Sequence, residues 1–243
     1  MPQPVDERGF RIRGAEPTRV EAFVDAAFAF AVTLLVVSVG SVPNSVPQLI
    51  DALRGVPAFA ASFAIIALIW QAHRKWSQRF ALEDPYTIRL SLMLVFTMLV
   101  YVYPLRMMFS MAFGGMTGGL LWEHPIGIAS IAEVRALYVI YAVGYGVVTL
   151  IISLLYRHAL RHADALALSP LERLRTRQNV RVWLIMVAVA GASLLLALLL
   201  PMRLEHGWSM GLPGLAYMLI WPLEALSARR DRAAVATLER ATP

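Results

Sequence analysis

The chain has 243 residues, of which 58% are hydrophobic and only 16% are charged, and its mean hydropathy is +0.62. Soluble domains carry roughly 25% charged residues and about 45–50% apolar ones. This composition therefore indicates a surface that contacts lipid. Because the sequence contains no cysteine, it excludes disulfide bonds and thiolate chemistry.

The net charge of +6 comes from 22 basic residues, all but one of them arginine. They lie almost entirely between apolar runs, whereas a protein that grips nucleic acid would gather them in a more contiguous stretch. We therefore interpret the charge as a signal of membrane topology and expect no nucleic-acid partner.

Residues 1–18 are rich in charge and contain no continuous apolar core, so they do not resemble a cleavable signal peptide. We expect them to form a cytoplasmic N-terminal arm. The first apolar run must then serve as the insertion signal.

Six apolar runs follow, and their lengths approach or exceed the ~20 residues of a membrane-spanning helix. The predicted spans are Val20–Val39, Pro57–His73, Thr87–Phe113, Ala132–Tyr156, Val180–Leu200 and Trp208–Leu226. Between the first two, Pro47 is placed to open a short interfacial helix. Pro104 is expected to kink the third span. The prediction is a single all-α membrane domain of six transmembrane helices, with residues 227–243 as a tail.

The orientation follows from the distribution of basic residues between the two sides. The N-terminal arm, the second and fourth connections and the tail together hold 18 of the 22, and the opposite side holds four. Cytoplasmic segments are enriched in lysine and arginine. We therefore expect a multi-pass protein of the cell membrane, inner or plasma, with both termini in the cytoplasm.

The first span carries an acidic residue, Asp25, at a depth where a charge is costly and needs a partner. Candidate partners are Arg19, Trp70 and His73. Farther along, Phe30, Leu34 and Val37 share one helical face, which Thr33 borders. Spacing alone favours a packed or lipid-facing stripe, not a pore.

The first span also contains a motif. Arg19, Phe23 and Asp25 follow the pattern Arg-x-x-x-Phe-x-Asp, and an alternating Phe-Ala run leads into Thr33-Leu-Leu. Trp70 and His73 lie at the end of the second span, and Arg74 follows directly. In these features the chain resembles the transmembrane-protein-175 family, which comprises the lysosomal potassium channels and their prokaryotic relatives. The resemblance is strong in the first half of the chain and rests on the span count in the second.

The resemblance implies a potassium-favouring cation channel that is a homotetramer, with the first helix of each subunit lining the pore. Phe30 would form the narrowest hydrophobic ring, with further rings at Leu34 and Val37 and a threonine layer at Thr33. Arg19, Phe23 and Asp25 would hold the first helix against the second and third. The partners implied are the potassium ion, membrane lipids and further copies of the chain, with no cofactor. As in the family, no Thr-Val-Gly-Tyr-Gly filter segment occurs.

The motif departs from the family pattern at two positions. The family serine is Val24 here, and the usual isoleucine of the constriction is the larger Phe30. Because apolar constrictions gate by dewetting, a ring of phenylalanine side chains would close the pore more firmly.

Other candidate sites are weak. His158 and His162 have the i, i+4 spacing of metal ligands, but nothing is positioned to complete a site, and a solvated surface is expected. No catalytic motif occurs, so we predict no enzyme. Two alternatives to the channel stay open: a proton-coupled transporter that titrates Asp25 and His73, and a non-conducting scaffold or sensor with the same fold.

Overall fold

The computed structural model describes residues 4–14, 16–38, 42–121, 130–200 and 207–240. Within these ranges the chain is helical, and the only β feature is an isolated bridge between Val5 and Arg11. The all-α fold predicted from the apolar runs is confirmed.

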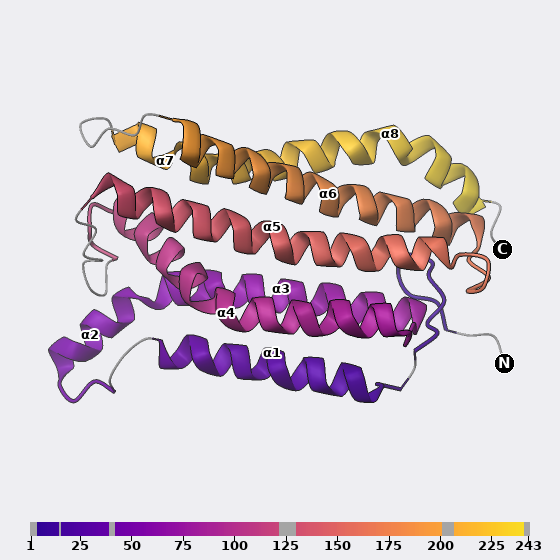
Figure 1. Ribbon diagram of the computed structural model, residues 1–243, viewed down its shortest axis with the longest axis horizontal. Helices are drawn as coiled ribbons and strands as arrows, with labels where there is room; N and C mark the ends of the chain where they lie inside the picture. Colours follow the sequence, from indigo (N-terminus) through magenta and orange to yellow (C-terminus); the bar gives the residue numbers. More distant parts are fainter. Residues whose placement is uncertain (1–3, 15, 39–41, 122–129, 201–206, 241–243) are drawn as a thin grey trace.

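The helices form an elongated bundle whose long members lie side by side (Figure 1). Their bounds are α1 (Arg19–Val37), α2 (Val46–Arg54), α3 (Val56–Phe80), α4 (Pro85–Met116), α5 (Ile131–Arg161), α6 (Pro170–Leu199), α7 (Gly207–Leu215), the 3₁₀ turn η1 (Ala216–Leu219) and α8 (Ile220–Arg240). α1 packs against α3 and α4 on one side of the bundle, α5 lies between α4 and α6, and α8 packs on α6. α1 is therefore a peripheral helix of the single chain.

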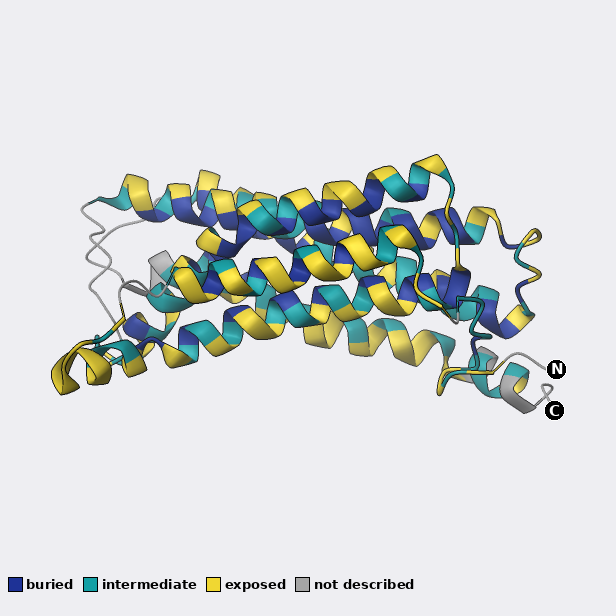
Figure 2. Cartoon of the chain, turned by 90° about the horizontal axis from the view of Figure 1, so that it is seen from below, coloured by how far each residue is buried: buried dark blue, intermediate teal, exposed yellow. Residues whose placement is uncertain are grey.

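Burial follows this layering: buried residues face the centre of the bundle and exposed residues face outward (Figure 2). Both termini lie at the same end of the bundle, where α3 and α5 end and α4 and α6 begin. The segments that hold the 18 basic residues therefore meet at one end of the molecule.

Polar caps explain where the helices begin. Each N-cap side chain accepts a hydrogen bond from a backbone amide of the first turn, which would otherwise lack a partner. The N-cap residues are Thr18, Ser45, Asp84, Ser130 and Ser169. Proline stands in the first turn of α2, α3, α4 and α6, where a missing N–H costs nothing. The short helix that Pro47 was predicted to open is confirmed as α2.

In the part of the chain that the structure describes, five helices are long and apolar enough to cross a membrane, judged by length and composition: α1, α3, α4, α5 and α6. α3, α4, α5 and α6 extend beyond the predicted spans; α6, for example, begins at Pro170 and not at Val180. A helix can continue past the hydrocarbon because its backbone hydrogen bonds are internal, whereas a hydropathy count stops at the first charges. The connection after the fourth span is thus mostly helix, with a short turn around Ala167 at φ 46°.

The last predicted span, Trp208–Leu226, is not one continuous helix. It is divided into α7, η1 and the start of α8. Pro222 has no N–H for the carbonyl of Met218, and its ring crowds that carbonyl, so the preceding turn tightens to 3₁₀. A second proline, Pro213, lies inside α7, and its carbonyl accepts a hydrogen bond from Ser193 Oγ of α6 at 2.8 Å. The prediction of one span here did not use these prolines, which mark where the helix is divided.

Close packing fixes the centre of the bundle where α4 crosses α5. A Cβ atom on Gly144 would overlap the ring of Tyr101, so only glycine fits at this position. The Tyr101 hydroxyl donates to the Tyr141 carbonyl at 3.2 Å. α4 changes direction along its length (Figure 1) and contains Pro104, as expected for a proline kink.

Candidate functional site

One face of α1 is buried against the bundle. Val24, Phe28, Ala31 and Leu35 have relative exposures of 0, 4, 0 and 0%. Their spacing of three and four residues places them on one side of the helix, toward α3 and α4. Val24, which replaces the family serine, is therefore a packing residue.

The opposite side of α1 is exposed along its whole length, and we call it the exposed stripe. Its members follow each other in alternating steps of four and three residues. They are Arg19, Phe23, Ala26, Phe30, Thr33 and Val37. Phe30 and Val37 keep 54 and 64% of their surface exposed. Three of the four predicted pore-lining residues thus lie on this stripe, whereas Leu34 lies at its edge and packs partly against the core.

The hydroxyl of Thr33 donates to the carbonyl of Ala29 in the preceding turn, at 3.2 Å. This bond occupies the hydrogen of the hydroxyl. The oxygen lone pairs remain available on the exposed stripe, where they can face a cation.

Asp25 lies to the side of the stripe and accepts a hydrogen bond from Trp70 Nε1 of α3 at 2.7 Å. The guanidinium of Arg74 lies 5.4 Å from the centroid of the Trp70 ring, in a cation–π arrangement. The indole therefore stands between a carboxylate at its N–H and a cation at its face. This contact joins α1 to α3.

His73 has a different partner. Its Nε2 lies 3.0 Å from Ser91 Oγ of α4, in a buried contact that joins α3 to α4. Asp25 and His73, the titrating pair of the transporter hypothesis, are thus directed to separate partners. Arg19 and Phe23, which the resemblance groups with Asp25 as anchors, are exposed on α1.

The far end of α1 is held by an arginine that the sequence analysis did not single out. Arg106 of α4 donates to the carbonyl of Ser38, the C-cap of α1, and also to Ser38 Oγ at 3.0 Å. A cation at a helix C-terminus stabilises the unpaired carbonyls there. An arginine two residues after Pro104, within an apolar run, was the available signal.

The N-terminal arm is folded onto the basic end of the bundle. Arg13 binds the carboxylate of Glu172 with two nitrogens, at 2.9 and 3.1 Å, and the amide of Arg11 donates to the same carboxylate at 2.9 Å. Glu172, in the first turn of α6, is fully buried. The backbone amides of Arg13 and Gly14 donate to the carbonyl of Gln78. The arm therefore connects α3 and α6 just before it enters α1.

A second ion pair fastens the beginning of the arm. Arg79 of α3 binds Asp6 at 2.8 Å, and its guanidinium lies 4.2 Å from the ring centroid of the buried Phe10. Burial raises the pKa of Asp6, but hydrogen bonds from the Phe10 amide and from Arg79 outweigh it and lower the pKa overall. These partners are separated by more than 60 residues in the chain, so no local pattern revealed them.

The expectation of a solvated His158 was wrong. Its side chain is buried, and Nε2 lies 2.8 Å from Asp84 Oδ2 at the N-cap of α4. Burial raises the pKa of Asp84, but hydrogen bonds from His158, Thr87 and the Tyr86 amide outweigh it and lower the pKa to about 2. This contact joins the start of α4 to the end of α5. Among the described residues, no group of three or more acidic, histidine or cysteine side chains is placed to hold a metal ion.

Comparison with known proteins gives consistent matches. The family model described as endosomal/lysosomal potassium channel TMEM175 matches residues 19–104, from the start of α1 to Pro104. A protein from Marivirga tractuosa named potassium channel is 35% identical over 196 residues, which cover 79% of each chain.

Two solved structures share the fold. The potassium channel MtTMEM175, crystallised as a point variant in complex with a nanobody–MBP fusion, gives a TM-score of 0.79 at 32% identity, covering 93% of this chain and 98% of that one. A TMEM175 homologue from Chamaesiphon minutus, described as a lysosomal potassium-selective channel, gives 0.55 at 18% identity, covering 88 and 97%. The second match shows the fold alone. The motif in α1 agrees with the family model, which matches from Arg19 onward, and the Marivirga tractuosa relative aligns over most of both chains. This chain therefore belongs to the TMEM175 family of potassium channels.

Proposed function

We propose that the chain is the subunit of a potassium channel whose ion pathway is lined by the exposed stripe of α1. The observation that carries this proposal is the position of the exposed stripe. It lies on the face of α1 opposite the one packed on α3 and α4, it combines the apolar Phe30 and Val37 with the polar Thr33, and it falls within the segment that matches the potassium-channel family model. Family membership supports potassium as the ion.

The gate in this proposal is the ring formed by Phe30, with Val37 beyond it and Thr33 between them. Four phenylalanine rings around one axis would exclude water from the narrowest point, and a dewetted constriction blocks ions without a charged barrier. Thr33 supplies the polar oxygen within this apolar segment. Leu34, at the edge of the stripe, would pack against the neighbouring subunit and support the ring.

The proposed assembly is a homotetramer surrounded by membrane lipid. α7, η1 and the start of α8 together make the sixth crossing, since the polypeptide must return to the end at which it began. The concentration of basic segments at the end that holds both termini supports a cytoplasmic location for that end.

The test is potassium flux from liposomes that contain the purified protein. Wild-type protein should pass potassium in preference to sodium, and Phe30→Ala should raise the flux several-fold because the ring no longer excludes water. Val37→Ala should also raise it. Val36→Ala is the matched control: Val36 is similarly exposed, at 53%, but is rotated away from the stripe by about 100°.

Absence of flux in both the wild-type protein and Phe30→Ala would contradict the channel. Equal effects of Val36→Ala and Val37→Ala would leave a channel but place its pathway elsewhere. Potassium movement that is coupled to protons and abolished by Asp25→Asn would instead establish the transporter.

A further inference from the structure

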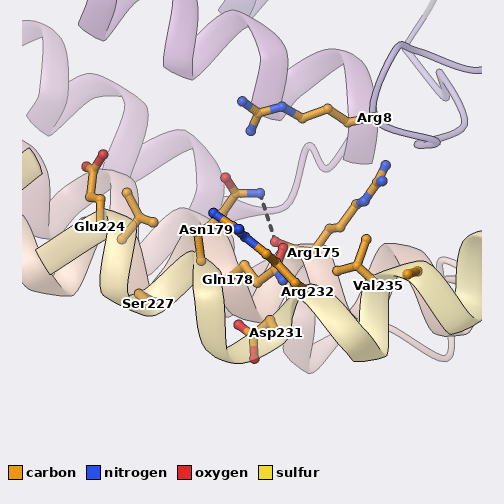
Figure 3. Close-up of a pocket in the computed structure, with 12 residues that line it drawn as sticks. Arg8, Arg175, Gln178, Asn179, Glu224, Ser227, Asp231, Arg232 and Val235 are labelled. Carbon is orange, nitrogen blue, oxygen red and sulfur yellow. Dashed lines mark hydrogen bonds between the residues drawn. The ribbon is translucent and has the colours of Figure 1, made fainter. Parts of the chain in front are cut away.

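A cavity of about 510 Å³ lies between α6 and α8, beside the N-terminal arm (Figure 3). Its volume falls within the ~300–1,000 Å³ of small-molecule sites. The α6 wall includes Arg175, Gln178 and Asn179, and the α8 wall includes Glu224 and Arg232. On α6, Gln178 and Asn179 follow Arg175 by three and four positions, and on α8 the two residues are eight positions apart, so each set lies on one helical face. The two faces line opposite sides of the cavity.

The position of the cavity along both helices coincides with the edge of the predicted spans. On α6, Arg175 and Asn179 precede the predicted start of the fifth span at Val180. On α8, Arg232 follows the predicted end of the sixth span at Leu226. The predicted span ends on both helices thus place the cavity at the level of the lipid headgroups, at the basic end of the bundle.

Arginines from three separate segments line this cavity. Arg8 comes from the arm, Arg175 from α6 and Arg232 from α8, and Glu224 lies at the other end of the cavity (Figure 3). The remaining acid, Asp231, is bound by Arg181 at 2.9 Å, which offsets its charge. The arginines of the lining outnumber its acids, so the cavity is electropositive. A planar guanidinium group can donate two parallel hydrogen bonds to two oxygens of one phosphate.

We propose that this cavity binds the phosphate group of an anionic ligand, held by Arg8, Arg175 and Arg232. At this depth the nearest source is the headgroup of an anionic phospholipid, and basic pockets between transmembrane helices bind such headgroups. Gln178 offers its amide group to the ester oxygens, as does the one N–H of Asn179 that is not bound to the Arg175 carbonyl. Val182, on the membrane side of the same wall, gives an apolar surface for the first carbons of an acyl chain.

Binding is measured by native mass spectrometry of the full-length protein with phosphatidylglycerol, phosphatidylcholine or soluble glycerol phosphate. The wild-type protein should retain phosphatidylglycerol over phosphatidylcholine. Arg8→Gln and Arg232→Gln should each weaken retention about fivefold, which corresponds to the ~1 kcal/mol contributed by one arginine near an anionic surface. Both arginines are exposed, so their removal should not prevent folding.

Two further variants separate a built cavity from diffuse charge. Arg229→Gln removes the same charge from α8 outside the cavity and should leave retention unchanged. Ala236→Trp fills the cavity without removing a charge and should abolish retention. Competition by glycerol phosphate would assign the site to soluble phosphates, and its absence to the lipid; either result supports the site. Equal losses in Arg229→Gln and Arg232→Gln, or undiminished retention in Ala236→Trp, would overturn it. None of these readouts depends on ion conduction.

Discussion

Glu172 holds a full negative charge in a position where its side chain has only 1% of its surface exposed. A carboxylate removed from water is costly unless it is paired and hydrogen-bonded. Here Arg13 supplies a bidentate partner, and the amides of Arg11 and Ser169 occupy further lone pairs. One side chain thus caps α6 and fixes the arm at the same time.

We predict that Arg13→Met destabilises the protein by about 3 kcal/mol, because the buried carboxylate loses its bidentate partner and keeps only the longer contact with the Arg11 guanidinium at 3.4 Å. Glu172→Gln should also destabilise, and the double variant should lose less than the sum of the two because both changes remove one interaction. The measurement is reversible unfolding in detergent.

A matched control is offered by the exposed ion pair of Arg173 with Asp164, whose acid keeps 94% of its side-chain surface exposed. Asp164→Asn should change the unfolding free energy by less than about 1 kcal/mol. Similar losses in Asp164→Asn and Glu172→Gln would show that the arm contributes no more than a surface ion pair.

At the scale of elements, two helix ends are closed by arginines from neighbouring helices. Arg106 of α4 binds the carbonyl of Ser38 after α1, and Arg135 of α5 binds the carbonyl of Leu200 after α6, at 3.2 Å. Both lie at the end of the bundle opposite the basic one. Two of the four arginines on that side thus satisfy C-terminal carbonyls, which the count of basic residues did not reveal.

We expect Arg106→Met to loosen the last turn of α1 while α4 stays folded. Loss of a cation from a helix C-terminus costs up to ~2 kcal/mol in a partly buried site, so the amides of that turn should exchange hydrogen at least several-fold faster. Hydrogen exchange read by mass spectrometry measures this. Arg54→Met, in the exposed α2, is the control and should leave exchange in α1 unchanged; unaltered exchange in Arg106→Met would contradict the closing role.

The sequence allowed prediction of elements whose pattern is local. Of the six spans that the apolar runs predicted, five correspond to long apolar helices among the described residues, and Pro47 marked α2. The motif from Arg19 to Leu35 identified the helix that carries the candidate site. Contacts between distant segments, such as Arg13 with Glu172 and Asp84 with His158, could not be predicted because nothing in the flanking residues specifies the partner.

At the scale of the whole molecule, the absence of cysteine makes the assembly directly testable. In the proposed tetramer, Val37 of neighbouring subunits lies close to the common axis. A chain with the single substitution Val37→Cys should therefore form disulfide-linked dimers in the membrane under mild oxidation. The band is read on a non-reducing gel.

Val36→Cys is the matched control, since it is the adjacent valine and points away from the exposed stripe. It should remain monomeric under the same conditions. Linked dimers from Val36→Cys alone, with none from Val37→Cys, would contradict the arrangement in which the exposed stripe faces the axis.

In the proposed channel, the fixation of α1 at both ends restricts how the pathway can widen. Turning α1 by one residue position, about 100°, would replace Phe30 and Val37 on the axis by Ala29 and Val36, and would exchange a ring for a methyl group. That turn would break the bond of Asp25 to Trp70 and carry Ser38 away from Arg106. The lower-cost motion keeps α1, α3 and α4 together and tilts them as one rigid body, so that Phe30 rings separate by a change in subunit angle and the helix does not rotate about its own axis.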